Sequence, residues 1–478
     1  MNLTLSLGVN GGTAKKRKVR DGAVDDVVGD GLDRGRVVMR LLQARERMMA
    51  RLQFDDPRVA APPDEGGAAA GGLRLMHLLL SSVAASEAGD AHTAAAALQE
   101  VYRRASFRGG DPAQRVAAYF ADALASRLLL SPPASPPPRA RQFLAYTMFY
   151  QASPLLQFAH FTANQAIVEA FEAGGRRRLH VVDFDVSYGC QWPSLIQSLS
   201  DAAAASTSSS HDGDCDGGEA AVSLRITGFG ASADELRQTE ARLARFASGC
   251  PNLRFEFEGV LNGPNNNGRH GRIVADVDAT VVVNLVFPAV PNSKTTTGSR
   301  DACSTLACIE SMNPSLVLLV ERDEGGGNAA SRRRTSLLPR FTASLRYYAA
   351  VFDSLHESLP VDSAERLAVE RDHLGREINA AVAALDDRRR RDGDDRMAEG
   401  GRASWKEVME RAGFEMVKLS SRTVSQAKLL LKMKSGCGGG GDGGFRVIEA
   451  DGGRAMSLGW RDSELITATG WRRRRRRG

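Results

Sequence analysis

The residues best placed to do chemistry in this 478-residue chain lie in the stretch 179–196, which reads LHVVDFDVSYGCQWPSLI. A short apolar run ends at Asp183, a second acid follows at Asp185, and helical spacing resumes after the triplet 191–193. In nucleotide-dependent enzymes a strand, a turn and a helix in this order hold a cofactor at the turn. The pattern therefore raises the hypothesis of a cofactor site.

The glycines that such a site needs are missing from this turn. A dinucleotide or S-adenosylmethionine site brings the backbone close to the cofactor, which requires glycine at fixed places. The methyltransferase form is an acid followed by three alternate glycines, whereas these four positions are Asp183, Asp185, Ser187 and Gly189 here. A carboxylate at 185 would repel an anionic cofactor, and losing glycine removes backbone freedom and space. We therefore predict a remodelled turn that binds no cofactor.

No stronger catalytic constellation is present in the sequence. It has no Gly-x-Ser-x-Gly elbow and no histidine pair at metal-ligand spacing, and its six cysteines form no CxxC pair. Asp183 and Asp185 on one strand would share a face without a nucleophile, so we expect them to accept bonds from backbone N–H groups or an arginine. We expect His180 to be a hydrogen-bonded structural residue. A methyltransferase-like enzyme or small-ligand sensor stays open as the alternative.

The elements around this turn alternate between strands and helices. Short apolar runs at 179–184, 222–227, 253–257, 280–287 and 316–320 predict strands, with helical patterns at 193–204, 232–248, 302–311 and 336–358. Near-continuous apolar strands separated by helices indicate a mostly parallel sheet covered on both faces, which is an α/β fold. After a helix at 404–412, strand-like runs at 414–419, 427–433 and 445–449 should add antiparallel edge strands.

The N-terminal part of the chain has a different character. Residues 1–72 are rich in Gly, Asp, Arg and Ala and should be mostly disordered, with one helix at about 36–52. From residue 73 to about 175 dense helical patterns predict a helical cap. Inserts of low complexity at 204–219, 262–271, 323–335 and 435–444 should form surface loops.

The net charge of +6 is concentrated at the two ends of the chain. The first twenty residues carry five positive charges, including the run Lys15, Lys16, Arg17 and Lys18, and the tail 472–477 carries six arginines. Subtracting these eleven charges leaves −5 for residues 21–471. The body is therefore not a basic nucleic-acid-binding surface, whereas the first run fits nuclear import as well as a solvated charge run. We find neither a membrane span nor a signal peptide.

At this point the motifs resemble those of the GRAS family of plant transcriptional regulators. The turn is similar to the family's Val-His-Ile-Ile-Asp motif, and the preceding segment 158–167 resembles its usual neighbour. The residues that carry the resemblance are His180, Asp183, Asp185, Gln191, Trp192 and Pro193 in that motif; Pro288, Phe341, Tyr348, Arg376 and Glu377 in the PFYRE motif; and Trp405, Gly413, Trp460 and Trp471 in the SAW motif.

The resemblance implies a division of the chain and a mode of action. It implies a GRAS domain at 73–471, divided into the cap (73–175), VHIID (176–200), second leucine-rich (221–275), PFYRE (280–390) and SAW (403–471) regions, with an arginine-rich tail at 472–478. It implies a Rossmann-like, methyltransferase-like core without enzyme activity or cofactor. It also implies a nuclear location, a heterodimer with another GRAS protein, DNA-binding transcription factors as partners, and weak or indirect DNA contact. Similarity to one subgroup implies symbiotic signalling through mycorrhiza, strigolactone synthesis and, in legumes, nodulation.

Two further sets of residues have both a structural and a functional interpretation. Leu75, Leu78 and Leu79 fit an LxxLL helix that could fill a partner's groove, although we favour a helix that faces the core. The SAW tryptophans should fill the core at the sheet edge rather than contact a partner.

Overall fold

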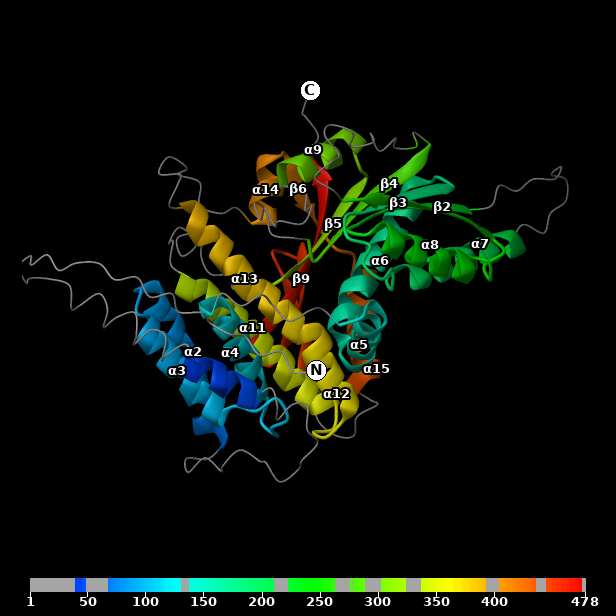
Figure 1. The fold of residues 1–478 in the computed structure, drawn as a ribbon. Coiled ribbons are helices and arrows are strands. Elements are labelled where there is room, and N and C mark those ends of the chain that lie inside the picture. Colours follow the sequence, from blue (N-terminus) through cyan, green and yellow to red (C-terminus); the bar gives the residue numbers. More distant parts are fainter. Residues whose placement is uncertain are drawn as a thin grey trace, which may run out of the picture.

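The computed structural model describes residues 39–48, 68–129, 137–209, 222–262, 276, 278–288, 302–323, 337–392, 404–435 and 444–474. A nine-stranded sheet lies at the centre of these residues, in the order β3-β2-β1-β4-β5-β9-β8-β7, with β6 also paired to β9 (Figure 1). The strands are β1 (Arg178–Asp183), β2 (Val222–Gly230), β3 (Leu253–Leu261), β4 (Ala279–Val286), β5 (Leu316–Arg322), β6 (Phe414–Val417), β7 (Phe445–Ala450), β8 (Ala455–Trp460) and β9 (Ser463–Arg473).

Strands β1 to β5 are parallel, and β6 to β9 add antiparallel pairs beyond β5. β4 and β5 are buried along almost their whole length because helices cover both faces of the sheet, which is why their sequences are continuous apolar runs. The predicted fold class, a mostly parallel α/β sheet with a helical cap, is therefore confirmed. The order reverses between β1 and β4, where a doubly wound sheet usually binds its ligand.

Two layers of helices enclose the sheet. α6 (Pro154–Gly174), α7 (Trp192–Ser209) and α8 (Ala233–Ala247) cover one face through an apolar cluster that includes Ile167, Trp192 and Leu243. α9 (Ala302–Met312) and α14 (Trp405–Arg411) cover the other, where Met409 packs near Trp471. Local signals set the helix ends: Ser153 caps α6 ahead of a proline, and Ser404 and Glu407 form a capping box on α14.

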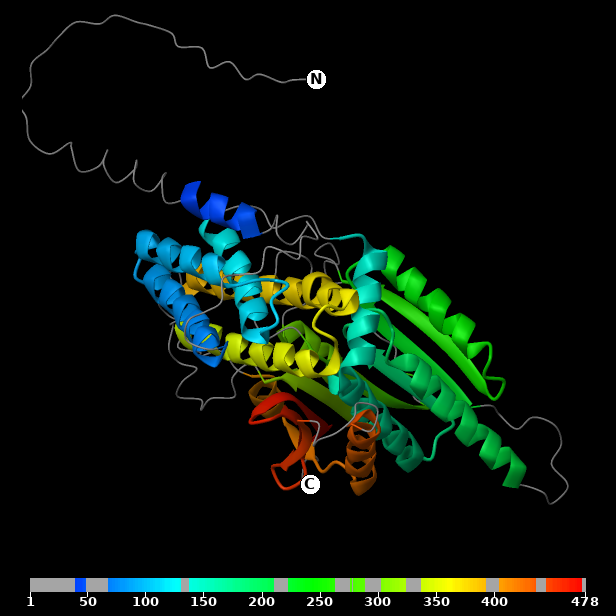
Figure 2. The same cartoon turned by 90° about the horizontal axis from the view of Figure 1, so that it is seen from below.

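The cap contains helices from two distant parts of the chain. Its N-terminal members are α2 (Ala68–Glu87), α3 (Ala91–Arg104), α4 (Pro112–Leu128) and α5 (Arg139–Ala152). α11 (Leu337–Ser358) and α13 (Gly375–Asp392) pack on α4, joined by α12 (Ala364–Val369) and the π-helix η1 (Glu370–Leu374), so the cap is composite (Figures 1 and 2). One large apolar cluster, which includes Phe120, Phe341 and Phe352, holds these helices together.

Several boundaries differ from the sequence predictions. The run 427–433 was predicted as a strand, but it lies in the helix α15 (Ser421–Ser435), because Val424, Ala427, Leu430 and Leu431 are buried at helical spacing. The antiparallel strands β8 and β9 and the helical segment formed by α12, η1 and α13 were not predicted, whereas the predicted helix at 404–412 is confirmed as α14. α7 continues to Ser209, into the predicted insert 204–219, and most of the four inserts lies outside the described residues.

Most of the predicted disordered region 1–72 also lies outside the described residues. Within it, residues 39–48 are helical, as predicted, and Leu41 and Met48 join the cap core. The predicted boundary at residue 72 is wrong, because residues 68–72 already belong to α2. No helix among the described residues is both long and apolar enough to cross a membrane.

Candidate functional site

The turn after β1 lies at the position where the strand order reverses. The backbone N–H of Asp185 donates to Asp183 Oδ1 at 3.3 Å, and the N–H of Ser187 donates to Asp185 Oδ1 at 3.2 Å. The two acids therefore accept bonds from backbone N–H groups, as predicted. They do not share a strand face, however, because β1 ends at Asp183 and Asp185 belongs to the turn.

The backbone of the turn corrects a second expectation. Ser187 has a φ of +45° and Gly189 a φ of +69°, so the turn adopts the left-handed conformation without a glycine at 187. Non-glycine residues in this region cost of the order of 1 kcal/mol or more, which the surrounding contacts must offset. Val186 supplies such contacts: its N–H donates to Phe229 O at 3.0 Å and its side chain is buried. The absence of glycine at position 187 therefore reduces the space available for a cofactor, but it does not prevent the left-handed conformation of the turn.

Three buried amides occupy the junction between the ends of β1 and β4. Gln191 Nε2 donates to Asn164 Oδ1 at 3.1 Å and to Asn284 Oδ1 at 3.2 Å, and Asn284 Nδ2 returns a bond to Gln191 Oε1 at 3.1 Å. Asn164 Nδ2 also donates to the Gln191 carbonyl at 2.9 Å. The network connects the turn to α6 and β4. Asn284 was missed by the sequence analysis, although an amide inside the apolar run 280–287 was a detectable signal.

Aromatic residues of the cap cover the outer side of the turn. The Tyr188 ring lies 5.1 Å from Phe143 and 5.0 Å from Tyr146, both on α5, and Arg139 lies 4.3 Å over the Tyr188 ring. Tyr146 in turn contacts the ring of His373 in η1 at 5.6 Å. The cap therefore contacts the turn through Tyr188, whereas Asp185 and Ser187 beside it are exposed to solvent.

One acid of the turn has a strongly perturbed pKa. Burial, together with a smaller contribution from the neighbouring Asp185 carboxylate, raises the pKa of Asp183 to about 7. A carboxyl group that titrates near neutrality could serve as a general acid or base, but Asp183 is buried and its Oδ1 accepts a bond from the backbone of the turn. Because Asp185 and Ser187 stand where a cofactor-binding turn has glycine, the residues present do not fit an anionic dinucleotide or S-adenosylmethionine.

The other residues of this motif are structural in their contacts. His180 is buried and hydrogen-bonded to Thr227 Oγ1 through Nε2 at 2.9 Å, and burial lowers its pKa to about 4. Trp192 is fully buried against α6 and α8, and Pro193 follows it in the first turn of α7. No group of three or more His, Cys, Asp and Glu side chains among the described residues is arranged to hold a metal ion.

The predicted PFYRE residues separate into two places. Phe341 and Tyr348 are buried in the cap, where their rings lie 5.4 and 5.9 Å from Phe120. Glu377 instead faces the sheet and pairs with Arg322 of β5 at 2.5 Å. Burial alone would raise the pKa of Glu377, but Arg322 together with His373 and Arg376 outweighs it, so the pKa is lowered.

The other two residues of the PFYRE motif are Pro288 and Arg376, which lie near the Arg322–Glu377 pair. Pro288 lies two residues after the end of β4, and the ring of its neighbour Phe287 lies 5.1 Å from the Arg322 guanidinium. Arg376 is exposed and donates to Gln142 of α5. Arg322, which contacts both Phe287 and Glu377, was not predicted, because a single arginine at a strand end gives no pattern.

The predicted SAW residues lie in and beside the sheet. Trp405 and Trp471 are buried in the cluster under α9 and α14, and Gly413 ends α14 with a φ of +78°. Trp460 is also buried, and its Nε1 donates to Asp353 Oδ2 of α11 at 2.7 Å. The three tryptophans thus occupy the core positions that were expected of them.

The structure describes the predicted LxxLL helix but not the predicted nuclear-import run. Leu75 and Leu79 are buried in the cap core, and Leu78 is half-buried against it, which fits the core-facing interpretation. The basic run Lys15, Lys16, Arg17 and Lys18 lies outside the described residues.

Comparisons with known proteins agree with the motifs and with the fold. Residues 75–472 match the GRAS domain family. The chain is 34% identical over 390 residues to Scarecrow-like protein 23 of Arabidopsis thaliana, covering 78% of this chain and 84% of that protein. It is 35% identical over 374 residues to protein SCARECROW 1 of Oryza sativa subsp. indica, covering 76% of this chain and 50% of that protein. The crystal structure of SCL7 in Oryza sativa is similar with a TM-score of 0.61 and 30% identity, covering 83% of this chain and 99% of that one.

Proposed function

The chain belongs to the GRAS domain family, and on this premise we propose that it is a nuclear transcriptional regulator that acts through protein partners and not by catalysis. Relatives such as Scarecrow-like protein 23 support a regulator of the GRAS type. The single observation that carries the non-enzymatic part is the amide network of Asn164, Gln191 and Asn284 at the strand reversal. Side chains of the protein itself fill the position where an enzyme of this topology binds its ligand.

The partners follow from charge and from the composite cap. Residues 21–471 carry a net charge of −5, which disfavours autonomous binding to DNA phosphates, so we propose that DNA-binding transcription factors recruit the protein. The cap is the largest set of helices outside the sheet, and we propose that it binds a second GRAS protein as a heterodimer. From the resemblance of the segments 184–200 and 223–230 to one subgroup of the family, we further propose a role in symbiotic signalling, including mycorrhization, strigolactone synthesis and nodulation in legumes.

Nuclear import is tested in plant cells with the full chain fused to a fluorescent protein. Replacing Lys15, Lys16, Arg17 and Lys18 by glutamine should remove nuclear accumulation, and deleting residues 472–478 is the matched control for loss of positive charge. In the same cells, a promoter-tethered fusion should change reporter output. A wild-type fusion that stays outside the nucleus and leaves the reporter unchanged would refute the proposal.

The alternative, a methyltransferase-like enzyme or small-ligand sensor, draws support from the strand order alone. Calorimetric titration of the full chain with S-adenosylmethionine separates the two functions. We expect no heat of binding, because Asp185 and Ser187 occupy the cofactor's space. Saturable binding at micromolar concentration would favour the enzyme.

A further inference from the structure

β9 ends in a run of arginines that begins inside the sheet. Arg472 and Arg473 belong to the part of β9 that pairs with β6, and the N–H of Arg474 donates to Gly413 O at 2.8 Å. Figure 1 shows the end of β9 next to β6. Trp471, directly before the run, is fully buried, whereas all three arginine side chains are exposed. The fold therefore holds the backbone of these arginines while their charges face solvent.

The arginines project from both faces of the sheet. Successive side chains of a strand point to opposite faces, so Arg473 lies on the same face as Trp471 and Arg472 lies on the other face. The face of Trp471 is the one that α9 and α14 cover. Three more arginines, 475–477, continue the run in the sequence and lie outside the described residues. A strand of consecutive arginines carries one positive charge about every 3.4 Å along its axis.

The acids beside the end of β9 do not neutralise this run. The hollow of about 350 Å³ at this place has two acids and two arginines in its lining, Glu410, Glu415, Arg454 and Arg474. These four charges balance one another. Arg474 lies 3.6 Å from Glu415, and both side chains are more than half exposed, so their pair contributes little. Within the described part of the chain, neither Arg472 nor Arg473 forms an ion pair.

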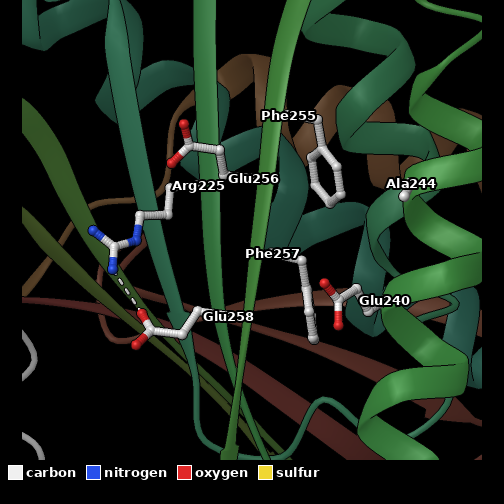
Figure 3. Close-up of a pocket in the computed structure, with 7 residues that line it drawn as sticks. All are labelled: Arg225, Glu240, Ala244, Phe255, Glu256, Phe257 and Glu258. Carbon is white, nitrogen blue, oxygen red and sulfur yellow. Dashed lines mark hydrogen bonds and ion pairs between the residues drawn. The ribbon is translucent and has the colours of Figure 1, made fainter.

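Exposed arginines at the opposite end of the sheet are paired with acids. Figure 3 shows the hollow beside β3, where Arg225 pairs with Glu258 at 2.7 Å. On the same strand Arg254 pairs with Glu256 at 3.1 Å. The β3 end of the sheet therefore carries little net charge, whereas the end of β9 carries an excess of positive charge.

Duplex DNA has the chemistry and the charge spacing that fit this run. A block of like charges without acidic partners is typical of a segment that binds a polyanion. A guanidinium group binds phosphate oxygens through two parallel N–H donors. Each strand of DNA carries one phosphate per about 3.4 Å of helix axis, which is also the rise per residue of a β-strand.

We propose that the arginines at the end of β9 bind the phosphates of duplex DNA, without reading its sequence, once a DNA-binding partner has brought the protein to its promoter. The inference rests on the proposed function, since it gives a DNA contact to a regulator that its partners recruit. Residues 21–471 carry a net charge of −5, so the contact is weak and depends on the arginines that follow them.

The test titrates a fluorescent DNA duplex with the full chain and follows anisotropy at salt concentrations from about 50 to 200 mM. The logarithm of the binding constant falls with the logarithm of the salt concentration by about 0.9 per phosphate contact. Replacing Arg472, Arg473 and Arg474 together by glutamine should make this slope less steep by about 2 to 3. Replacing the same three residues by lysine keeps the charges and should keep most of the slope. A duplex of shuffled sequence should bind the wild type equally well.

A matched variant removes three charges elsewhere. Arg103→Gln, Arg237→Gln and Arg254→Gln change exposed arginines that each pair with an acid, and they should leave the slope unchanged. An equal change of slope in both glutamine variants would overturn the proposal. So would an unchanged slope in the variant at 472–474, or a loss that appears only when the basic run 15–18 is replaced.

A competitor distinguishes phosphate from a protein partner rich in carboxylates. Poly-glutamate at the same total charge should displace the duplex at least tenfold less effectively, because duplex DNA concentrates about twice as many charges in the same length. Equal competition would assign the run to an acidic protein instead and overturn the proposal. Binding of the purified protein needs no nucleus or promoter, so this result is independent of the import and reporter tests.

Discussion

Glu370 carries a buried negative charge between two buried arginines, and replacing it is expected to destabilise the protein strongly. Arg115 Nε lies 2.9 Å and Arg366 Nη1 3.3 Å from Glu370 Oε1. The side chains of Arg115 and Glu370 are 0% exposed and that of Arg366 is 3% exposed. Glu370 begins η1, whereas Arg115 belongs to α4, so the triad connects the two halves of the composite cap.

The size of the effect follows from the desolvation of these charges. Burial raises the pKa of Glu370 although Arg115 and Arg366 oppose the shift, and burial lowers the pKa of Arg115 although Glu370 opposes it. Both shifts mean that pairing does not fully compensate for the loss of water. Glu370→Gln keeps the shape but leaves two guanidinium charges without a counter-charge. Breaking a buried pair in this way costs about 3–5 kcal/mol, against a total stability of about 5–15 kcal/mol.

Replacing the whole triad should cost less than the single change. Arg115→Met, Arg366→Met and Glu370→Leu together remove the charges of the triad, and what remains is mainly the loss of three bonds to backbone carbonyls, from Arg115 Nη1 to Gly109 and Gly110 and from Arg366 Nη2 to Val361. Three such bonds contribute about 3 kcal/mol, which the burial of the new apolar side chains partly offsets. The triple variant should therefore be more stable than Glu370→Gln, although it carries more substitutions.

Urea unfolding followed by circular dichroism measures both variants against the wild type. Asp234→Asn is the control, since its pair with Arg237 has both side chains 74% exposed and should contribute less than about 1 kcal/mol. A loss below about 1 kcal/mol in Glu370→Gln, or a triple variant less stable than the single one, would show that the buried charge is not what the structure indicates.

Further predictions concern the turn and the cap core. The pKa of Asp183 is about 7 in the folded protein, above its usual 3.8, so the native state binds this proton more tightly than the unfolded state does. The free energy of unfolding should therefore fall as the pH rises from about 4 to 7. The midpoint of urea unfolding should change less across that range in Asp183→Asn than in the wild type. Gln191→Leu removes the bonds that its side chain makes to Asn164 Oδ1 and to both amide atoms of Asn284, and should cost about 2–4 kcal/mol by urea unfolding; the idea fails if stability is unchanged. Leu75→Ala should cost about 2–5 kcal/mol because the side chain is buried, whereas a groove-filling leucine would lose partner binding at constant stability.

The sequence predicted those parts of the fold whose physical signals are local. The strands β1, β4 and β5 are continuous apolar runs, and the tryptophans at 405, 460 and 471 occupy the core as expected. The run 427–433 was misassigned because a short apolar segment fits a strand or a helix equally well until its buried face is known. At the two ends of the chain the only sequence signal is the concentration of positive charge, and charge alone predicts no secondary structure.

The missed residues depend on contacts across long separations. Arg115 meets Glu370 across 255 positions, and Asn164 meets Gln191 across 27. A single arginine or asparagine inside a helix gives no indication of such a partner. The composite cap was missed for the same reason, since only packing on α4 distinguishes α11 from a helix that covers the sheet.

The π-helix η1 connects the cap to the turn after β1 through several side chains. Within five residues it sends Glu370 to Arg115 of α4, Asp372 to Arg141 of α5 at 2.7 Å, and His373 to the ring of Tyr146. These contacts hold the cap beside the turn after β1, because Tyr146 also contacts the ring of Tyr188. Wide helix turns of this kind concentrate at functional positions since they aim several side chains in different directions at once. The five residues of η1 therefore fix the position of the cap relative to the strand end at which a sheet of this topology binds its ligand in enzymes.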